Sequence, residues 1–89
     1  MSESQEWALA CGGDAAAFGR VFDLHYARVL RHAARVTDDR HEAEDAVATA
    51  FLELWRRRRE VRLVEGSPLP WLLVTATRCA QNVRRSSWR

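Results

Sequence analysis

Two groups of polar side chains in this 89-residue chain have the chemistry of binding surfaces. The first group consists of carboxylates at the start of the segment EAEDAVATAFLELW: Glu42, Glu44 and Asp45. The second group is a stripe of arginine and amide side chains at helical spacing near the end of the chain: Arg78, Asn82, Arg85 and Arg89. Carboxylates suit a basic partner, whereas arginines and amides suit phosphates and the edges of nucleic-acid bases.

The two groups lie in parts of the chain with opposite net charge. Residues 1–55 contain ten acidic residues and five arginines, and residues 56–89 contain nine arginines and two acidic residues. The formal net charge of +2 hides this division. Such segregation indicates two partners of opposite sign, or one domain with an acidic and a basic pole.

Catalytic and metal-binding patterns are absent from the sequence. It contains no Gly-rich phosphate loop and no nucleophile with a plausible base. His25, His32 and His41 are not at mutual ligand spacing, and Cys11 and Cys79 form no C-x-x-C motif. We therefore predict two free thiols, no metal or other cofactor, and a protein that is not an enzyme and acts by binding alone.

The N-terminal residues and the hydropathy of the chain bear on its location. The N-terminus is acidic and polar, unlike a signal peptide, and no apolar run approaches the ~20 residues of a membrane span. We therefore expect no membrane association and a cytoplasmic location, where free thiols stay reduced.

Apolar periodicity predicts a single all-α domain over residues 1–89. In the central segment one helical stripe collects the apolar side chains: Ala43, Ala46, Val47, Ala50, Phe51, Leu54 and Trp55. The expected fold is a small helical bundle with a short lead helix and three longer helices, at approximately residues 4–11, 14–36, 40–59 and 68–86. The second and third helices should pack antiparallel because their link is short, with the final helix across them.

Helix boundaries are indicated by capping residues. The candidate N-caps of the first three helices are Ser2 or Ser4, Asp14, and Asp38 or Asp39. Residues 61–66 have no helical period, so we expect a loop there. Ser67 should then cap the final helix, with Pro68 at its first helical position.

Three segments in this order resemble the core domain, region 2, of bacterial RNA polymerase sigma factors of the extracytoplasmic-function (ECF) type. They are DAAAFGRVFDLHYARVLRHAARVTDD, EAEDAVATAFLELW and GSPLPWLLVTATRCAQNVRR. The resemblance spans roughly residues 7–86 and implies the helical fold of sigma factor region 2. It also implies a role in promoter recognition and opening during transcription initiation.

In that family the acidic helix docks on the clamp helices of the largest subunit of core RNA polymerase. The resemblance therefore implies that Glu42, Glu44, Asp45 and Thr49 form the docking surface, with the first three as its carboxylates. The family often has Gln-Glu or Ala-Glu where this chain has Ala48 and Thr49, so one docking charge is missing at position 49. An anti-sigma factor is a further partner that the resemblance implies.

The loop and final helix of the family open and read the non-template strand of the minus-ten promoter element, with a flipped base held by the loop. The implied loop residues are Arg62, Val64, Glu65, Gly66 and Ser67. The implied reading residues on the helix are Arg78, Gln81, Asn82, Arg84 and Arg85. The family frequently has Asn where Arg78 stands, which bears on promoter preference. Capturing an unpaired base exposes its Watson–Crick edge and its aromatic face to a small protein.

Two alternatives stay open at the level of sequence. Full-length sigma factors of this type carry a second, helix-turn-helix domain, which is absent here, so we expect a fragment of a longer protein rather than a reduced relative. The rival function is a helical regulatory adaptor whose acidic helix binds a basic protein and whose arginines serve only solubility. Nucleic-acid binding that falls steeply with salt would distinguish a sigma factor from an adaptor.

Overall fold

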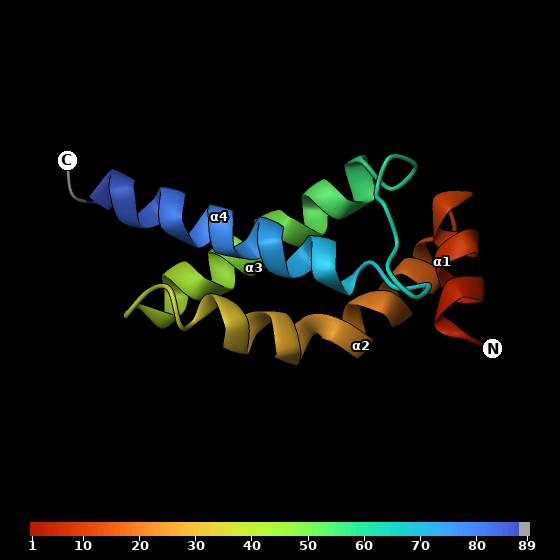
Figure 1. Ribbon diagram of the computed structural model, residues 1–89, viewed down its shortest axis with the longest axis horizontal. Coiled ribbons are helices and arrows are strands. Elements are labelled where there is room, and N and C mark those ends of the chain that lie inside the picture. The colour runs from red at the N-terminus through yellow and green to blue at the C-terminus, as the bar shows by residue number, and fades with distance from the viewer. Residues whose placement is uncertain (88–89) are drawn as a thin grey trace.

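The computed structural model describes the backbone of residues 1–87 and the side chains of residues 1–82. Within this range the chain forms four helices: α1 (Glu3–Cys11), α2 (Ala15–Ala33), α3 (Arg40–Arg56) and α4 (Leu69–Ser87). The three long helices run along the 43 Å axis of the molecule, and α1 crosses one end (Figure 1). Helices α2 and α3 are antiparallel, and α4 packs against both. The prediction of an all-α bundle with a short lead helix is confirmed.

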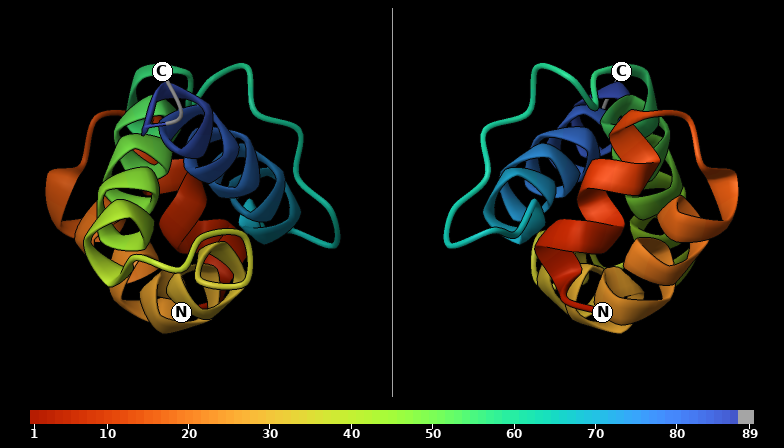
Figure 2. Two further views of the ribbon diagram at one scale, coloured as in Figure 1. Left: turned by 90° about the vertical axis from the view of Figure 1, so that its left-hand side faces the viewer. Right: turned by 90° about the vertical axis from the view of Figure 1, so that its right-hand side faces the viewer.

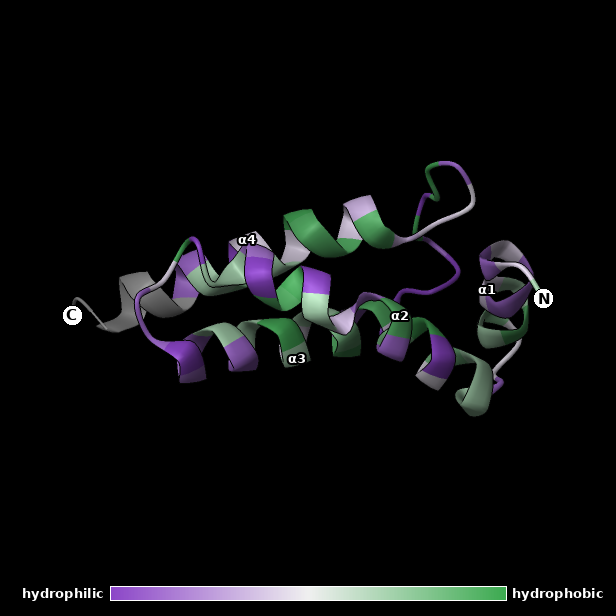
Figure 3. Cartoon of the chain, turned by 90° about the horizontal axis from the view of Figure 1, so that it is seen from below, coloured by the Kyte–Doolittle hydropathy of each residue, from purple (hydrophilic) through white to green (hydrophobic). Residues whose placement is uncertain are grey.

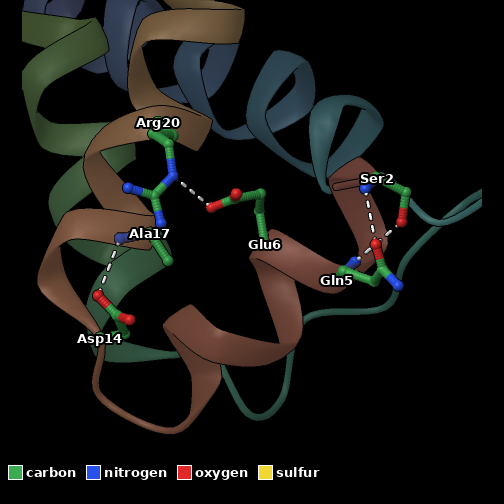
Figure 4. Close-up of polar contacts among 6 residues, drawn as sticks. All are labelled: Ser2, Gln5, Glu6, Asp14, Ala17 and Arg20. Carbon is green, nitrogen blue, oxygen red and sulfur yellow. Dashed lines mark hydrogen bonds and ion pairs between the residues drawn. The ribbon is translucent and has the colours of Figure 1, made fainter.

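The first three helices begin at residues whose side chains accept backbone hydrogen bonds. The Ser2 hydroxyl accepts from the Gln5 N–H at 3.3 Å, and the Gln5 side chain accepts from the Ser2 N–H at 2.8 Å, which completes a capping box (Figure 4). Asp14 accepts from the Ala17 N–H at 3.0 Å in the same view. Asp39 caps α3 in the same way. Ser2 and Asp39 are therefore the caps in the two pairs that the sequence left open.

Helices α2 and α4 differ from the expected ranges by a few residues. Helix α2 ends at Ala33 rather than at residue 36, because the next residues form turns with i→i+3 hydrogen bonds that reverse the chain toward α3. Helix α4 begins at Leu69, so Pro68 precedes the helix instead of occupying its first position. The Ser67 hydroxyl still caps it, since it accepts from the Leu69 N–H at 3.1 Å.

Helix α3 ends at Arg56, three residues before the expected end at residue 59, because Arg58 turns back onto the chain. Arg57 has left helical geometry, with φ −105° and ψ 15°. The Arg58 guanidinium donates to the carbonyl oxygens of Trp55 at 2.8 Å and Cys11 at 3.3 Å. It also lies 4.1 Å from the centre of the Trp55 ring, in cation–π geometry. The arginine run thus closes α3 and attaches it to α1.

The core lies between α2, α3 and α4 and contains many small side chains. Fully buried larger residues come from all three helices: Val21, Val29, Val47, Leu54 and Leu72. Alanines without exposed surface lie on α3 and α4, among them Ala43, Ala50, Ala76 and Ala80. Small residues at a helix contact shorten the interaxial distance, so the long helices can pack closely. Purple and green segments alternate along the long helices in Figure 3, as expected for helices with one buried face.

Aromatic side chains join the lead helix and the first long helix to this core. Trp7 is 4% exposed and anchors α1. The rings of Phe22 and Phe51 lie 4.6 Å apart, and Phe18 meets Trp55 edge-on at 5.1 Å. Trp55, which the periodicity placed in the core stripe, is only half-buried and lies at the edge of the core. No helix in the described part of the chain is both long and apolar enough to cross a membrane.

Candidate nucleic-acid and protein interfaces

The four residues of the expected docking surface on α3 are not equally available for a partner. Glu42 is half-buried and accepts a hydrogen bond from the Thr37 hydroxyl at 2.6 Å, so it stabilises the turn before the helix. Glu44 pairs with Arg40 at 3.0 Å. Asp45 and Thr49 are exposed and have no hydrogen-bond or ion-pair partner within the described residues. The exposed face of α3 therefore centres on positions 45 and 49.

A leucine that the sequence analysis did not select lies on the same face of α3. Leu52 is 48% exposed, and it follows Asp45 and Thr49 by seven and three residues, about two turns and one turn of helix. An apolar centre beside charged residues is typical of protein–protein interfaces. The signal was available, because Leu52 falls outside the apolar stripe that the sequence predicts to be buried. We define Asp45, Thr49 and Leu52 as the α3 face.

The loop between α3 and α4 contains a tight turn at residues 64–67. Val64 and Ser67 exchange backbone hydrogen bonds of 3.0 and 3.1 Å. Glu65 and Gly66, the two central residues, have φ values of +52° and +77°. Positive φ at both central positions is the mark of a type I′ turn. Val64 and Glu65 are exposed at the tip of this turn, and Arg62 is exposed just before it.

The base of this turn is held by other parts of the protein. The Ser67 hydroxyl donates to Glu3 at 2.7 Å in addition to capping α4, so its one donor proton is already used. A Cβ added at Gly66 would lie 3.3 Å from the Cβ of Ser4. Of the five loop residues expected to contact DNA, Arg62, Val64 and Glu65 are thus free at the surface. Gly66 and Ser67 shape the turn.

The outer face of α4 carries the expected reading residues whose side chains the structure describes. Arg78, Gln81 and Asn82 are exposed and have no partner among residues 1–82. Arg78 lies about 14 Å along the helix from Leu69, at 1.5 Å per residue. Val74 is 53% exposed one turn before Arg78 and extends this face with apolar surface that the sequence analysis did not select. Arg84, Arg85 and Arg89 lie outside the residues whose side chains are described.

The arginine run after α3 contributes less free positive charge than its composition indicates. Arg56 and Arg57 pair with Glu53 at 3.1 and 3.3 Å. Arg58 is engaged with backbone carbonyl oxygens and with Trp55, as described above. Arg59 is exposed and, among the described residues, donates only to the Cys11 carbonyl oxygen, at 3.5 Å, so it keeps its positive charge. Free positive charge near the turn therefore comes from Arg59 and Arg62, and along α4 from Arg78.

A serine, a histidine and a glutamate meet below the turn, but their geometry differs from that of a catalytic triad. Glu3 lies 2.5 Å from Nε2 of His25, and the Ser67 hydroxyl lies 3.5 Å from the same nitrogen. In a triad the acid and the nucleophile bind opposite ring nitrogens, so that the histidine can relay a proton. Here the contact is structural. No cluster of three potential metal ligands occurs in the described part of the chain.

Both cysteines are free thiols, as predicted. Burial raises the pKa of the Cys11 thiol, against the opposing positive charges of Arg58 and Arg59. Burial also raises the pKa of Cys79, and the negative charge of Glu53 adds to the effect. Neither thiol is therefore activated as a nucleophile.

Comparison with known proteins decides the family. The Sigma-70 region 2 family matches residues 21–89, which include most of α2, all of α3 and the turn with α4. The chain belongs to the sigma-70 region 2 family. The resemblance seen in the sequence is thereby confirmed, and the family is one of non-enzymatic transcription factors, as the sequence analysis expected.

Curated relatives of this sigma-70 region 2 chain are ECF sigma factors. It is 37% identical over 68 residues to "ECF RNA polymerase sigma factor SigK" of Mycobacterium ulcerans (strain Agy99), covering 76% of the chain and 36% of that protein. It is 38% identical over 69 residues to the proteins of the same name from Mycobacterium bovis (strain BCG / Pasteur 1173P2) and Mycobacterium tuberculosis (strain ATCC 25618 / H37Rv), covering 78% of the chain and 37% of each. The chain thus spans little more than a third of the length of these relatives. No solved structure matches it significantly.

Proposed function

We propose that this domain binds core RNA polymerase through the α3 face and recognises the non-template strand of the minus-ten promoter element through the turn at residues 64–67 and the outer face of α4. The observation that carries the proposal is the family match over residues 21–89, which contains all three surfaces. Side-chain exposure supports it, since Asp45, Glu65 and Arg78 are free to meet a partner. Such a protein works in the cytoplasm.

The α3 face suits a rigid protein partner. Asp45 offers an unpaired carboxylate and Leu52 offers apolar surface one to two turns further along the same helix. Thr49 lies between them and adds no charge. A basic partner helix with an apolar stripe, such as one of the polymerase clamp helices, would match both features. A regulatory protein such as an anti-sigma factor would compete for the same face if it used the same chemistry.

The turn and α4 suit a single strand whose bases are unstacked. Arg62 and Arg78 can neutralise phosphates on either side of the turn and so set the register of the strand. Gln81 and Asn82 can exchange hydrogen bonds with base edges further along α4. The domain opens the duplex if it binds the unpaired base at the turn more tightly than it binds the same base stacked in the duplex. The binding free energy of the unpaired base then offsets the free-energy cost of unstacking it.

The chemistry of Glu65 gives the proposal a base preference. An ionised carboxylate accepts hydrogen bonds and donates none. Glu65 is exposed at the tip of the turn and has no partner among the described side chains. A captured base with an exocyclic amino group is therefore favoured over thymine, which presents no amino group. Glu65→Gln should weaken this preference, because the amide can both donate and accept.

The test is fluorescence anisotropy of a labelled single-stranded minus-ten library with the 89-residue chain, with and without core RNA polymerase. We expect base-selective binding that sharpens with polymerase and falls steeply as salt rises. A matched duplex of the same sequence, which offers no unpaired base, should bind more weakly. Absence of both polymerase binding and base preference would contradict the proposal and favour the adaptor function.

A further inference from the structure

Helix α1 contacts both ends of the connection between α3 and α4. At the start of the connection, Arg58 donates to the Cys11 carbonyl oxygen at 3.3 Å, and the Cys11 thiol donates to the Arg58 carbonyl oxygen at 3.4 Å. At the end of the connection, Ser67 donates to Glu3 at 2.7 Å. Glu3 and Cys11 are the first and last residues of α1, about 12 Å apart at 1.5 Å per residue. The lead helix therefore spans the connection as a strut.

The figures show the same arrangement. Helix α1 crosses the end of the bundle at which the connection enters α4 (Figure 1 and the right view of Figure 2). It packs on α2, so its own position is fixed by the core side of the molecule. The family match begins at residue 21, after α1. The strut is thus a feature of this chain that lies outside the matched region.

The contact between the strut and the turn is a chain of hydrogen bonds with one consistent set of donors. The Glu3 carboxylate can only accept when ionised, so Nε2 of His25 and the hydroxyl of Ser67 both donate to it. The Ser67 oxygen in turn accepts from the Leu69 N–H. The His25 side chain is only 8% exposed and is carried by α2. The turn is thereby tied through Glu3 to a buried residue of a packed helix.

We propose that Glu3 and His25 are positioning residues for base recognition: acting through Ser67, they hold the base of the turn so that Val64 and Glu65 are presented in one geometry. This inference rests on the proposed function, because it assumes that the tip of the turn contacts a base. Its consequence is that two residues remote from the tip set base selectivity. Neither touches the nucleic acid.

If Glu3 served only to attach α1 to the rest of the protein, loss of any other contact that attaches α1 would change base selectivity equally. The chain offers a matched control for this case. Glu6 also lies on α1 and pairs with Arg20 of α2 at 2.6 Å (Figure 4). This pair helps to join α1 to α2 but touches no residue of the turn. Loss of Glu6 therefore weakens the attachment of α1 and leaves the Glu3–Ser67 contact in place.

The experiment compares Glu3→Ala, Ser67→Ala and Glu6→Ala. For each folded variant in the presence of core RNA polymerase, anisotropy gives the ratio of affinities for the preferred minus-ten strand and for a strand with one changed base. Loss of one hydrogen bond to a charged group should lower this ratio about fivefold in Glu3→Ala and Ser67→Ala. Affinity for polymerase should stay within about twofold, because the α3 face is untouched. The double variant should lose no more selectivity than Ser67→Ala alone, because Ser67→Ala already removes the Glu3–Ser67 contact together with the cap of α4.

One further variant, and a fallback among those already named, keep the proposal open to refutation. Glu3→Gln retains an acceptor oxygen at the same reach and should keep most of the selectivity. If Glu3→Ala does not fold, Ser67→Ala decides, because it leaves the Glu3–His25 contact intact. A ratio unchanged in folded Ser67→Ala, or lowered equally by Glu6→Ala, would overturn the proposal. Failure of the proposed function itself is distinguishable, because the unmodified chain would then show no base selectivity.

Discussion

The α3 face and the turn at residues 64–67 are both exposed, yet their geometry has different origins. The α3 face lies on a regular helix whose opposite side is buried, so helical geometry alone positions Asp45, Thr49 and Leu52. The turn has no buried side of its own and depends on two residues with positive φ and on contacts with α1. Substitutions on the α3 face should therefore change binding without changing the fold. Substitutions in the turn should change both.

The largest expected contrast is between two leucines of α3 that are two residues apart. Leu54 is fully buried, whereas Leu52 is 48% exposed. Leu54→Ala should lower the free energy of unfolding by about 2–5 kcal/mol, because it leaves a cavity in the core. Leu52→Ala should change it by less than about 0.5 kcal/mol. It should nevertheless weaken polymerase binding several-fold. Urea denaturation and polymerase titration of the two variants measure both quantities, and equal loss of stability would show that the α3 face is part of the core.

Charge reversal on the α3 face should have the next largest effect. Asp45→Arg replaces an exposed, unpaired carboxylate with a cation. We expect a loss of about 100-fold in polymerase affinity, about 2.7 kcal/mol, since like charges then meet at the interface. The melting temperature should hardly change. The control is Asp23→Arg, which reverses an exposed charge on α2. Normal polymerase binding by Asp45→Arg, or an equal loss of affinity in Asp23→Arg, would show that the docking surface lies elsewhere.

The difference between a surface on a regular helix and a turn held by distant contacts also explains which features the sequence could predict. Helices, caps and buried stripes depend on residues three to four positions apart, and the all-α bundle with its capping residues Asp14 and Ser67 followed from such patterns. The exposed Leu52 could also have been found, because it lies off the apolar stripe. Local periodicity therefore suffices for a surface built on a regular helix.

The contacts of the turn could not be predicted in this way. Glu3 and Ser67 are 64 residues apart, and nothing local to either indicates that they share a hydrogen bond. His25 resembled an isolated histidine on a helix, although it is a buried partner of Glu3. Arg58 belonged to a run that continued the helix by composition, yet it turns back toward Cys11. Each of these contacts can be predicted only once the packing of α1 is known.

A pair of glycine substitutions distinguishes the positive-φ geometry of the turn from regular helical geometry, with moderate effects on the free energy of unfolding. Gly66 has φ +77°, and a Cβ there would lie 3.3 Å from Ser4, whereas a Cβ at Gly19 in α2 would meet nothing within 4 Å. Gly66→Ala should lower the free energy of unfolding by about 1–2 kcal/mol, since positive φ is unfavourable for alanine. Gly19→Ala should raise it by about 0.5–1 kcal/mol, since alanine is the better helix former. Denaturation of both variants tests the turn geometry. A neutral Gly66→Ala would mean that the turn adopts another conformation in solution.

The smallest effect concerns the thiols, which report separately on the contact of α1 with the α3–α4 connection and on α4. Cys11 lies where α1 meets the α3–α4 connection, and Cys79 lies on α4. Burial raises the pKa of both thiols, so each carries less thiolate near pH 8 than an exposed cysteine. Alkylation at pH 8 should therefore be several-fold slower in the folded chain than in urea. Because the folded state retains these protons to higher pH, stability should fall as pH rises from the ordinary thiol pKa through the raised values. Serine substitutions at each position assign the alkylation rates to the two cysteines.

Since Glu3→Ala leaves the Cys11–Arg58 contacts in place, alkylation of Cys11 should stay slow in that variant. Rapid alkylation of Cys11 there would show that α1 is released as a whole rather than from the turn alone.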